Sequence, residues 1–96
     1  RTWANAKKYC QNLELNEYTN WRLPNIEELL SITDDKKYDP AIKKGFKNII
    51  SDYYWSSSSY ISGGEDAWYV YFQRGDDGLI NKYAKFYVRC VKDKEL

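Results

Sequence analysis

The sequence contains no histidine and no methionine, and only two of its 96 residues are cysteine. Without histidine, the commonest general base, the usual triad base and the usual transition-metal ligand are all missing. Two thiols alone cannot complete a zinc site. Excess charge is also missing, because 15 Lys and Arg residues balance 14 Asp and Glu residues to a net charge of +1. A nucleic-acid-binding module is therefore not expected.

Long hydrophobic runs are absent too, since no apolar stretch approaches the roughly 20 residues that span a bilayer. What remains is typical of a globular protein, with 43% hydrophobic and 30% charged residues. We expect one domain over residues 1–96. Aromatic residues reach 18%, including ten tyrosines and four tryptophans. These side chains combine an apolar body with a polar tip, so they suit both a thin core and a binding face.

The two cysteines, Cys10 and Cys90, lie near opposite ends of the chain. We expect them to form a disulfide, which implies an oxidising, extracytoplasmic compartment. The alternative is two unrelated buried thiols. The chain opens directly on RTWANAKKYC, which has a helical pattern and no export signal. We therefore expect a fragment whose export signal and upstream segments are missing.

Two helices are predicted in the first half of the chain. Apolar residues at spacings of three and four predict a helix over residues 2–14, with Thr2 as its N-cap. Asn25 and Glu28 form a variant capping box that predicts a second helix ending near Thr33. Arg22 is expected to pair with Glu27 or Glu28. A polar loop follows over residues 34–45, and three apolar residues after it are expected to pack onto the core: Phe46, Ile49 and Ile50.

Strands are predicted in the second half. YYWSSSS leads into a loop rich in serine and glycine, and AWYVYFQR alternates in the manner of a half-buried strand. The alternation assigns Trp68, Val70 and Phe72 to the core and turns Tyr69 and Tyr71 outward. GDDG at 75–78 is expected to form a hairpin turn before LINKYA, and KFYVRCV to form the last strand. Helices followed by strands predict an α+β fold with an antiparallel sheet.

Five motifs in order, W..A..YC, NWRLPNIEELLSI, YYWSSS, AWYVYF..G and YVRCV, cover nearly the whole chain. The chain therefore resembles the C-terminal domain family of the Legionella collagen-like adhesin, which is similar in turn to the C-type lectin-like fold. The resemblance implies a non-enzymatic domain of an exported bacterial protein, with a disulfide between the first helix and last strand, where Cys10 and Cys90 lie. The family's usual strand before the first helix is missing, so an incomplete sheet is expected.

Tyrosines and cations on the hairpin, with the loop beside it, form the candidate ligand-binding surface. Tyr and Arg are enriched at binding hot spots, and loops on a rigid scaffold often carry function. The alternative is an ordinary tyrosine-rich face covered by other parts of the domain. Trp3, Trp21, Trp55 and Trp68 are core candidates. The predicted ligand-binding residues are Tyr60, Glu65, Asp66, Tyr69, Tyr71, Arg74, Lys82, Tyr83 and Lys85.

Other site chemistries are not expected. Two acidic pairs, Glu65–Asp66 and Asp76–Asp77, could offer oxygen ligands to calcium, but the EPN and WND tripeptides of calcium-dependent lectins are missing. Nothing indicates the opposed carboxylates of a glycosidase, and the serines at 56–59 have no histidine partner. We expect no metal, no cofactor and no enzymatic activity.

The sequence thus predicts a binding or adhesion module whose ligand is a glycan, a sulfated polyanion or a protein. The alternative is a structural or oligomerisation domain without a ligand of its own. Nucleic acid and direct membrane insertion are not expected, whereas the parent protein could form a homo-oligomer. The expected location is the periplasm, the cell surface or the medium.

Overall fold

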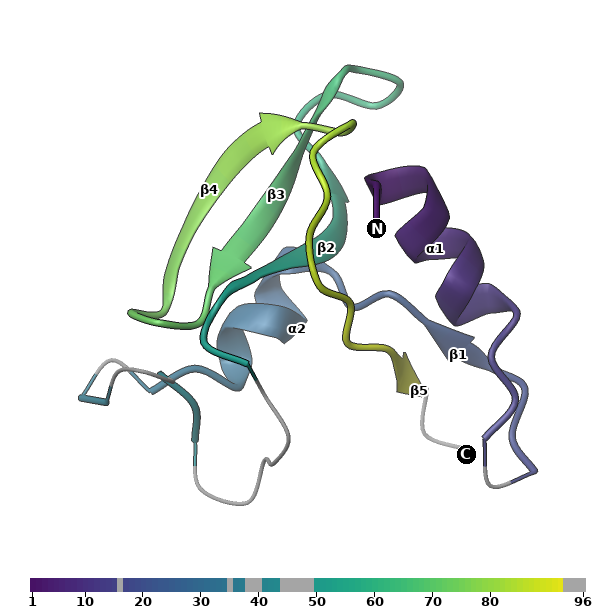
Figure 1. The fold of residues 1–96 in the computed structure, drawn as a ribbon, viewed down its shortest axis with the longest axis horizontal. Coiled ribbons are helices and arrows are strands. Elements are labelled where there is room, and N and C mark those ends of the chain that lie inside the picture. The colour runs from purple at the N-terminus through teal and green to yellow at the C-terminus, as the bar shows by residue number, and fades with distance from the viewer. Residues whose placement is uncertain (16, 35, 38–40, 44–49, 93–96) are drawn as a thin grey trace.

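The computed structural model describes residues 1–15, 17–34, 36–37, 41–43 and 50–92. It confirms the α+β class, with two helices followed by a three-stranded antiparallel sheet and a separate two-stranded sheet (Figure 1). No helix in this part of the chain has the length and apolar character needed to cross a membrane. The elements are α1 (Trp3–Gln11), β1 (Trp21–Arg22), α2 (Ile26–Ser31), β2 (Tyr53–Ser59), β3 (Asp66–Tyr71), β4 (Asp76–Asn81) and β5 (Val91–Lys92).

Helix α1 is shorter than predicted at its C-terminal end. It stops at Gln11, where the N–H of Asn12 donates to carbonyls of the last turn. Thr2 occupies the N-cap position with extended backbone, but its side chain makes no capping hydrogen bond. The predicted apolar stripe is confirmed at Ala6 and Cys10, which are both fully buried.

Helix α2 begins with the predicted capping box. The backbone N–H of Glu28 donates to Asn25 Oδ1 at 2.8 Å, and the N–H of Asn25 donates to Glu28 Oε1 at 3.0 Å. The same carboxylate accepts two hydrogen bonds of 2.6 Å from the guanidinium of Arg22, which confirms Glu28 as a partner of this arginine. One side chain therefore caps α2 and joins it to β1.

This carboxylate makes the domain sensitive to acid. The Arg22 hydrogen bonds, with help from the Asn25 N–H, hold the pKa of Glu28 at about 2, below its ordinary 4.5. The pKa of Glu28 is lower in the folded than in the unfolded protein, so its carboxylate stabilises the fold above about pH 4.5. This stabilisation is lost as pH falls toward 2. The pair is over a third exposed, so Glu28→Gln should destabilise by no more than about 1 kcal/mol at pH 7. Thermal melts of both proteins should converge near pH 2; an equal difference at every pH would contradict this assignment.

The sheet has the order β2-β3-β4, and its second hairpin turns earlier than predicted. The turn spans residues 72–75 rather than 75–78, because Gly75 adopts a left-handed φ of 81° that suits glycine and its N–H donates to Tyr71 O at 2.8 Å. Asp76 then pairs directly with Tyr71, so the acidic residues of GDDG lie within β4.

The segment after β4 is less regular than the predicted last strand. Over residues 82–92, which the structure describes, the only ladder is β5, where two residues pair with β1, while Tyr87 forms a single parallel bridge to Tyr54. The backbone of Phe86 instead exchanges two hydrogen bonds with Arg1. Phe86, Val88 and Cys90 nevertheless pack against the same core cluster, as their predicted common face requires.

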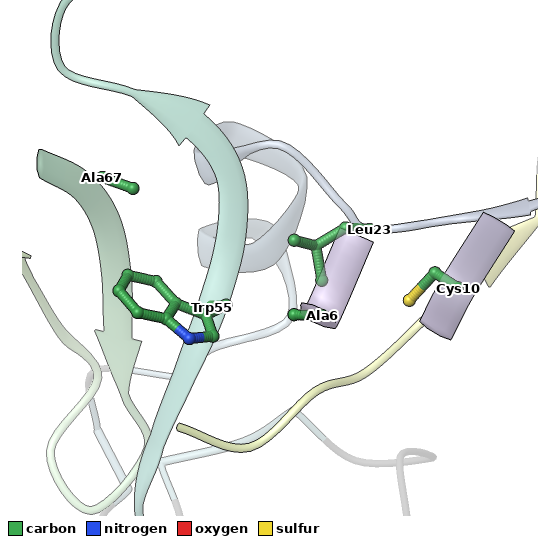
Figure 2. Packing of buried hydrophobic residues seen from close by; sticks show 5 residues of the cluster. All are labelled: Ala6, Cys10, Leu23, Trp55 and Ala67. Atoms are coloured by element: carbon green, nitrogen blue, oxygen red, sulfur yellow. The ribbon is translucent and has the colours of Figure 1, made fainter. Parts of the chain in front are cut away.

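Two core clusters lie against opposite faces of the sheet. The first contains Trp55 and Ala67 of the sheet, packed with Ala6 and Cys10 of α1 and with Leu23 (Figure 2). The second contains Leu29 of α2 with residues of the alternate sheet positions, Tyr54, Val70 and Phe72. Because both faces are packed, the expectation that Tyr69 points away from the core is wrong: Tyr69 packs against the first cluster.

The large apolar residues divide between these clusters and the surface. Trp55 is fully buried, whereas Trp3, Trp21 and Trp68 are half-buried, and neither cluster of the described residues includes Trp68. Ile50 is 53% exposed, so the expectation that it packs onto the core is wrong. Phe46 and Ile49, predicted to pack with it, lie outside the described residues.

The disulfide between Cys10 and Cys90 is confirmed, with an S–S distance of 2.09 Å and a Cα–Cα distance of 5.4 Å. It joins the buried face of α1 to the segment just before β5, over a sequence separation of 80 residues. Such a bond indicates an oxidising, extracytoplasmic compartment.

Candidate functional site

The sheet places the predicted ligand-binding residues at two separate ends. Arg74 lies in the turn before β4, and Lys82 and Tyr83 follow β4 at its other end. Six residues of extended chain separate these ends by about 20 Å. Arg74 is also paired with Asp76 at 3.0 Å. The three predicted cations therefore do not form one compact cluster.

The tyrosines of the sheet form an aromatic stack. The rings of Tyr71 and Tyr53 are nearly parallel with centroids 4.2 Å apart, and Tyr53 continues onto Phe86 at 5.0 Å. Tyr69 meets Tyr53 edge-on at 5.2 Å, and the guanidinium of Arg74 lies 5.5 Å from the Tyr71 ring. Tyr71 therefore has one ring face against Tyr53 and Arg74 near its ring, whereas Tyr69 is held by edge contacts with Tyr53 and Phe86.

Gly78 belongs to this stack although it has no side chain. It is paired with Tyr69 across β3 and β4, and a Cβ atom at Gly78 would lie 2.5 Å from the tyrosine hydroxyl. The Tyr69 ring therefore lies directly over the glycine. This close approach requires glycine at position 78 and fixes Tyr69 in its packed position.

A cleft opens at the other end of the sheet, and we call it the Tyr83 cleft. Its volume is about 340 Å³, and it includes three predicted residues: Glu65, Lys82 and Tyr83. Tyr83 is the most exposed large hydrophobic side chain among the described residues, at 81%. The full lining is Thr2, Trp3, Ala4, Gly63, Gly64, Glu65, Lys82 and Tyr83.

Hydrogen bonds from Lys82 hold the three segments of this cleft together. Its ammonium donates to Gly64 O at 2.5 Å and its backbone N–H donates to Glu65 O at 2.8 Å. Its carbonyl accepts from the Trp3 N–H at 3.0 Å. The loop of β2–β3, the chain after β4 and the start of α1 thus meet at one lysine.

Aromatic rings of α1 hold three cations. The ammonium groups of Lys82 and Lys7 lie 4.1 and 4.4 Å from the Trp3 ring centroid, and the Arg1 guanidinium lies 4.3 Å from that of Tyr9. Such cation–π contacts restrict long side chains that would otherwise be mobile.

Two further cations adjoin Arg1. Lys8 lines a depression with Arg1 and Tyr9, and Lys85 lines another with Arg1 and Asp52. We call the five cations the basic band: Arg1, Lys7, Lys8, Lys82 and Lys85. The depressions of the band also contain acids, namely Glu14, Asp52 and Glu65, so its excess of positive charge is two.

The remaining predicted residues lie near the cleft. Tyr60 is 59% exposed, and Asp66 is exposed at the start of β3. The sequence reasoning missed Trp3, Lys7 and Arg1, because helix 2–14 was judged by its apolar stripe alone. The adjacent lysines at 7 and 8, one turn after a tryptophan, were the available signal.

Comparison with known proteins gives one match. The sequence model of a family described as the Lcl C-terminal domain matches residues 1–92. No curated protein and no solved structure matches the chain. The similarity to the C-type lectin-like fold therefore stays a prediction, whereas the α+β class is established.

Proposed function

Because the chain belongs to the Lcl C-terminal domain family, we propose that it is a non-enzymatic ligand-binding module of an exported bacterial protein. Of the three ligand classes predicted, an acidic glycan fits the surface best. The observation that carries this proposal is the pair of lysines held against the Trp3 ring, of which Lys82 lines the Tyr83 cleft.

The chemistry of the cleft suits a sugar. The exposed ring of Tyr83 offers an apolar face, and the adjacent loop has glycine at 63 and 64, so no side chain projects into the cleft from these two positions. Clefts with an apolar wall and a few polar groups are typical of small-ligand sites. The basic band adds positive potential, which favours a ligand carrying sulfate or carboxylate groups.

The packed stack of Tyr53, Tyr69 and Tyr71 favours a different role for the sheet face. These rings contact one another, stacked for Tyr53 and Tyr71 and edge-on for Tyr53 and Tyr69, so we propose that they stabilise the scaffold while the cleft and basic band bind the ligand. The disulfide supports a location in the periplasm, at the cell surface or in the medium.

Binding of dextran sulfate, with neutral dextran as the reference, tests this proposal by calorimetric titration. For about three ionic contacts, the counterion-release rule measured for nucleic acids predicts roughly a 20- to 40-fold loss of affinity between 50 and 200 mM salt. The double variant Lys7→Gln/Lys85→Gln should bind more weakly and show a smaller salt slope, by about 0.7–0.9 per contact removed.

Lys36→Gln is the matched control, since Lys36 is an exposed lysine in the 34–43 region, outside the basic band. It should bind as the unchanged protein does. Equal binding of charged and neutral dextran would contradict an acidic ligand and would indicate a neutral glycan instead. If Tyr71→Ala lost binding and Lys7→Gln/Lys85→Gln did not, the ligand would bind at the sheet face of Tyr69 and Tyr71 rather than at the cleft and basic band.

A further inference from the structure

The outer edge of β4 is open in the described structure. β4 pairs with β3 on one side, and among the described residues no strand lies on its other side (Figure 1). No described backbone hydrogen bond links residues 76–80 to a segment outside the sheet. An edge of this kind presents unpaired N–H and C=O groups that can pair with another chain.

Apolar side chains accompany this edge. Leu79 of β4 lies opposite Trp68 of β3, and both are half-buried although neither belongs to a core cluster of the described residues. Ile80, on the other face, is 37% exposed. The edge therefore combines free backbone groups with apolar surface that the domain itself does not cover.

We propose that this edge pairs with the β4 edge of a second copy of the chain, antiparallel and about a two-fold axis through Leu79. The two three-stranded sheets then form one continuous six-stranded sheet. A two-fold axis makes each contact occur twice, as in most homodimers. The proposal goes beyond ligand binding and does not depend on it.

Strand geometry limits the possible registers. In an antiparallel pair, two opposed residues either both direct their backbone groups to the partner or both direct them away. These directions alternate along one edge. When two identical edges pair, the residue numbers of two opposed residues must therefore differ by an even number. The axis therefore passes through a residue, and the two central choices are Gly78 and Leu79.

Charge selects Leu79. In that register Asp76 lies opposite Lys82, the first residue after β4, and Asp77 lies opposite Asn81. The acidic start of each strand thus lies toward the basic end of the other, which is favourable although Asp76 is already paired with Arg74 and the Lys82 ammonium with Gly64 O. An axis through Gly78 instead opposes Asp76 to Ile80 and Asp77 to Leu79, which places a carboxylate against each of two apolar side chains.

The apolar contacts agree with the same register. In this register Leu79 lies opposite Leu79 of the second copy, on the sheet face that carries Trp68. Leu79 and Trp68 of both copies then form one four-residue apolar cluster. On the other side, Ile80 lies opposite Gly78, beside the Tyr69 ring that covers this glycine. The interface is small, so the dimer should be weak and should form at high protein concentration.

Disulfide cross-linking tests the register. Residues at the axis have Cα atoms about 4.5–5.5 Å apart, within the disulfide range of about 4.4–6.8 Å. Leu79→Cys should therefore form a covalent dimer under mild oxidation. Ile80→Cys is the matched control, because its copies are offset by two residues along the strand and lie about 8 Å apart. Non-reducing mass measurement should show several times more dimer for Leu79→Cys.

Sedimentation equilibrium of the full chain tests the dimer itself. The weight-average mass should rise with concentration, and Leu79→Lys, which opposes two ammonium groups at the axis, should restore the monomer while circular dichroism stays unchanged. Ile61→Lys removes another exposed apolar residue, 63% exposed on the β2–β3 loop, and should leave the dimer intact. A monomer at all concentrations up to ~1 mM, equal cross-linking of both cysteine variants, or an oligomer that survives Leu79→Lys would each overturn the proposal.

Discussion

Replacing Cys10 and Cys90 with alanine should lower the free energy of unfolding by about 2–5 kcal/mol. The bond closes a loop with a sequence separation of 80 residues, so its removal frees most of the unfolded chain. A domain of this size has only a few kcal/mol of net stability from its core. The variant should therefore be largely unfolded at 37 °C.

Urea unfolding followed by circular dichroism measures this effect. The unchanged protein in strong reductant should lose the same stability as the double variant, which separates loss of the bond from any effect of alanine. Reductant should leave the variant itself unaffected. If the free energy of unfolding fell by less than ~1 kcal/mol, the disulfide would not be what holds α1 against the last segment.

Replacing Trp55 with alanine should cost about 3–5 kcal/mol. Its side chain is fully buried in the first core cluster, where its ring packs against Phe86 with centroids 4.8 Å apart. Its indole N–H also donates to Arg1 O at 2.9 Å. The substitution leaves a large cavity and removes this hydrogen bond, while Arg1 O keeps the hydrogen bond from the Phe86 N–H, so the cavity supplies most of the loss.

Trp68→Ala is the matched control for this substitution. Trp68 lies on the same sheet but is half-buried and outside both clusters, so its loss should cost about 1 kcal/mol, in the range of ordinary substitutions. Both variants are measured by urea unfolding at low protein concentration, where the proposed dimer is dissociated. Similar losses in the two variants would contradict the division between a core and a surface tryptophan.

Local features were the most predictable part of this fold. The capping box at Asn25 and Glu28 depends on residues three positions apart, so the sequence alone specifies it. The strands at 53–59 and 66–71 follow from aromatic and β-branched runs bounded by glycine and serine. The family resemblance rested on motifs in the same places.

The sidedness of the sheet could not be predicted in this way. An alternating run assigns its residues to two faces but does not say whether one or both are packed. Tyrosine fits either answer, because its ring packs and its hydroxyl tolerates water. Tyr69 is packed because Phe86 and Gly78, from other parts of the chain, meet its ring.

The candidate site shows a similar limit. Glu65, Lys82 and Tyr83 were predicted from the hairpin and its loop, but their cleft is completed by Trp3, almost 80 residues away in sequence. Only the tertiary fold brings this tryptophan between Lys7 and Lys82. Arg74, in contrast, was placed with them because the predicted turn gave no measure of the length of β4.

The Cys10–Cys90 bond also determines how the domain responds to mechanical load. A force that pulls on the chain on either side of the two cysteines passes through the covalent bond, because the bond is the shortest path between them. The segment between them, which would extend by about 3.3–3.6 Å per residue if it unravelled, carries none of this tension. The three-stranded sheet lies within this segment and therefore keeps its shape under a pull that would unravel the same fold in its reduced form, whereas Thr2, Trp3 and Ala4 of the Tyr83 cleft precede Cys10 and remain under load.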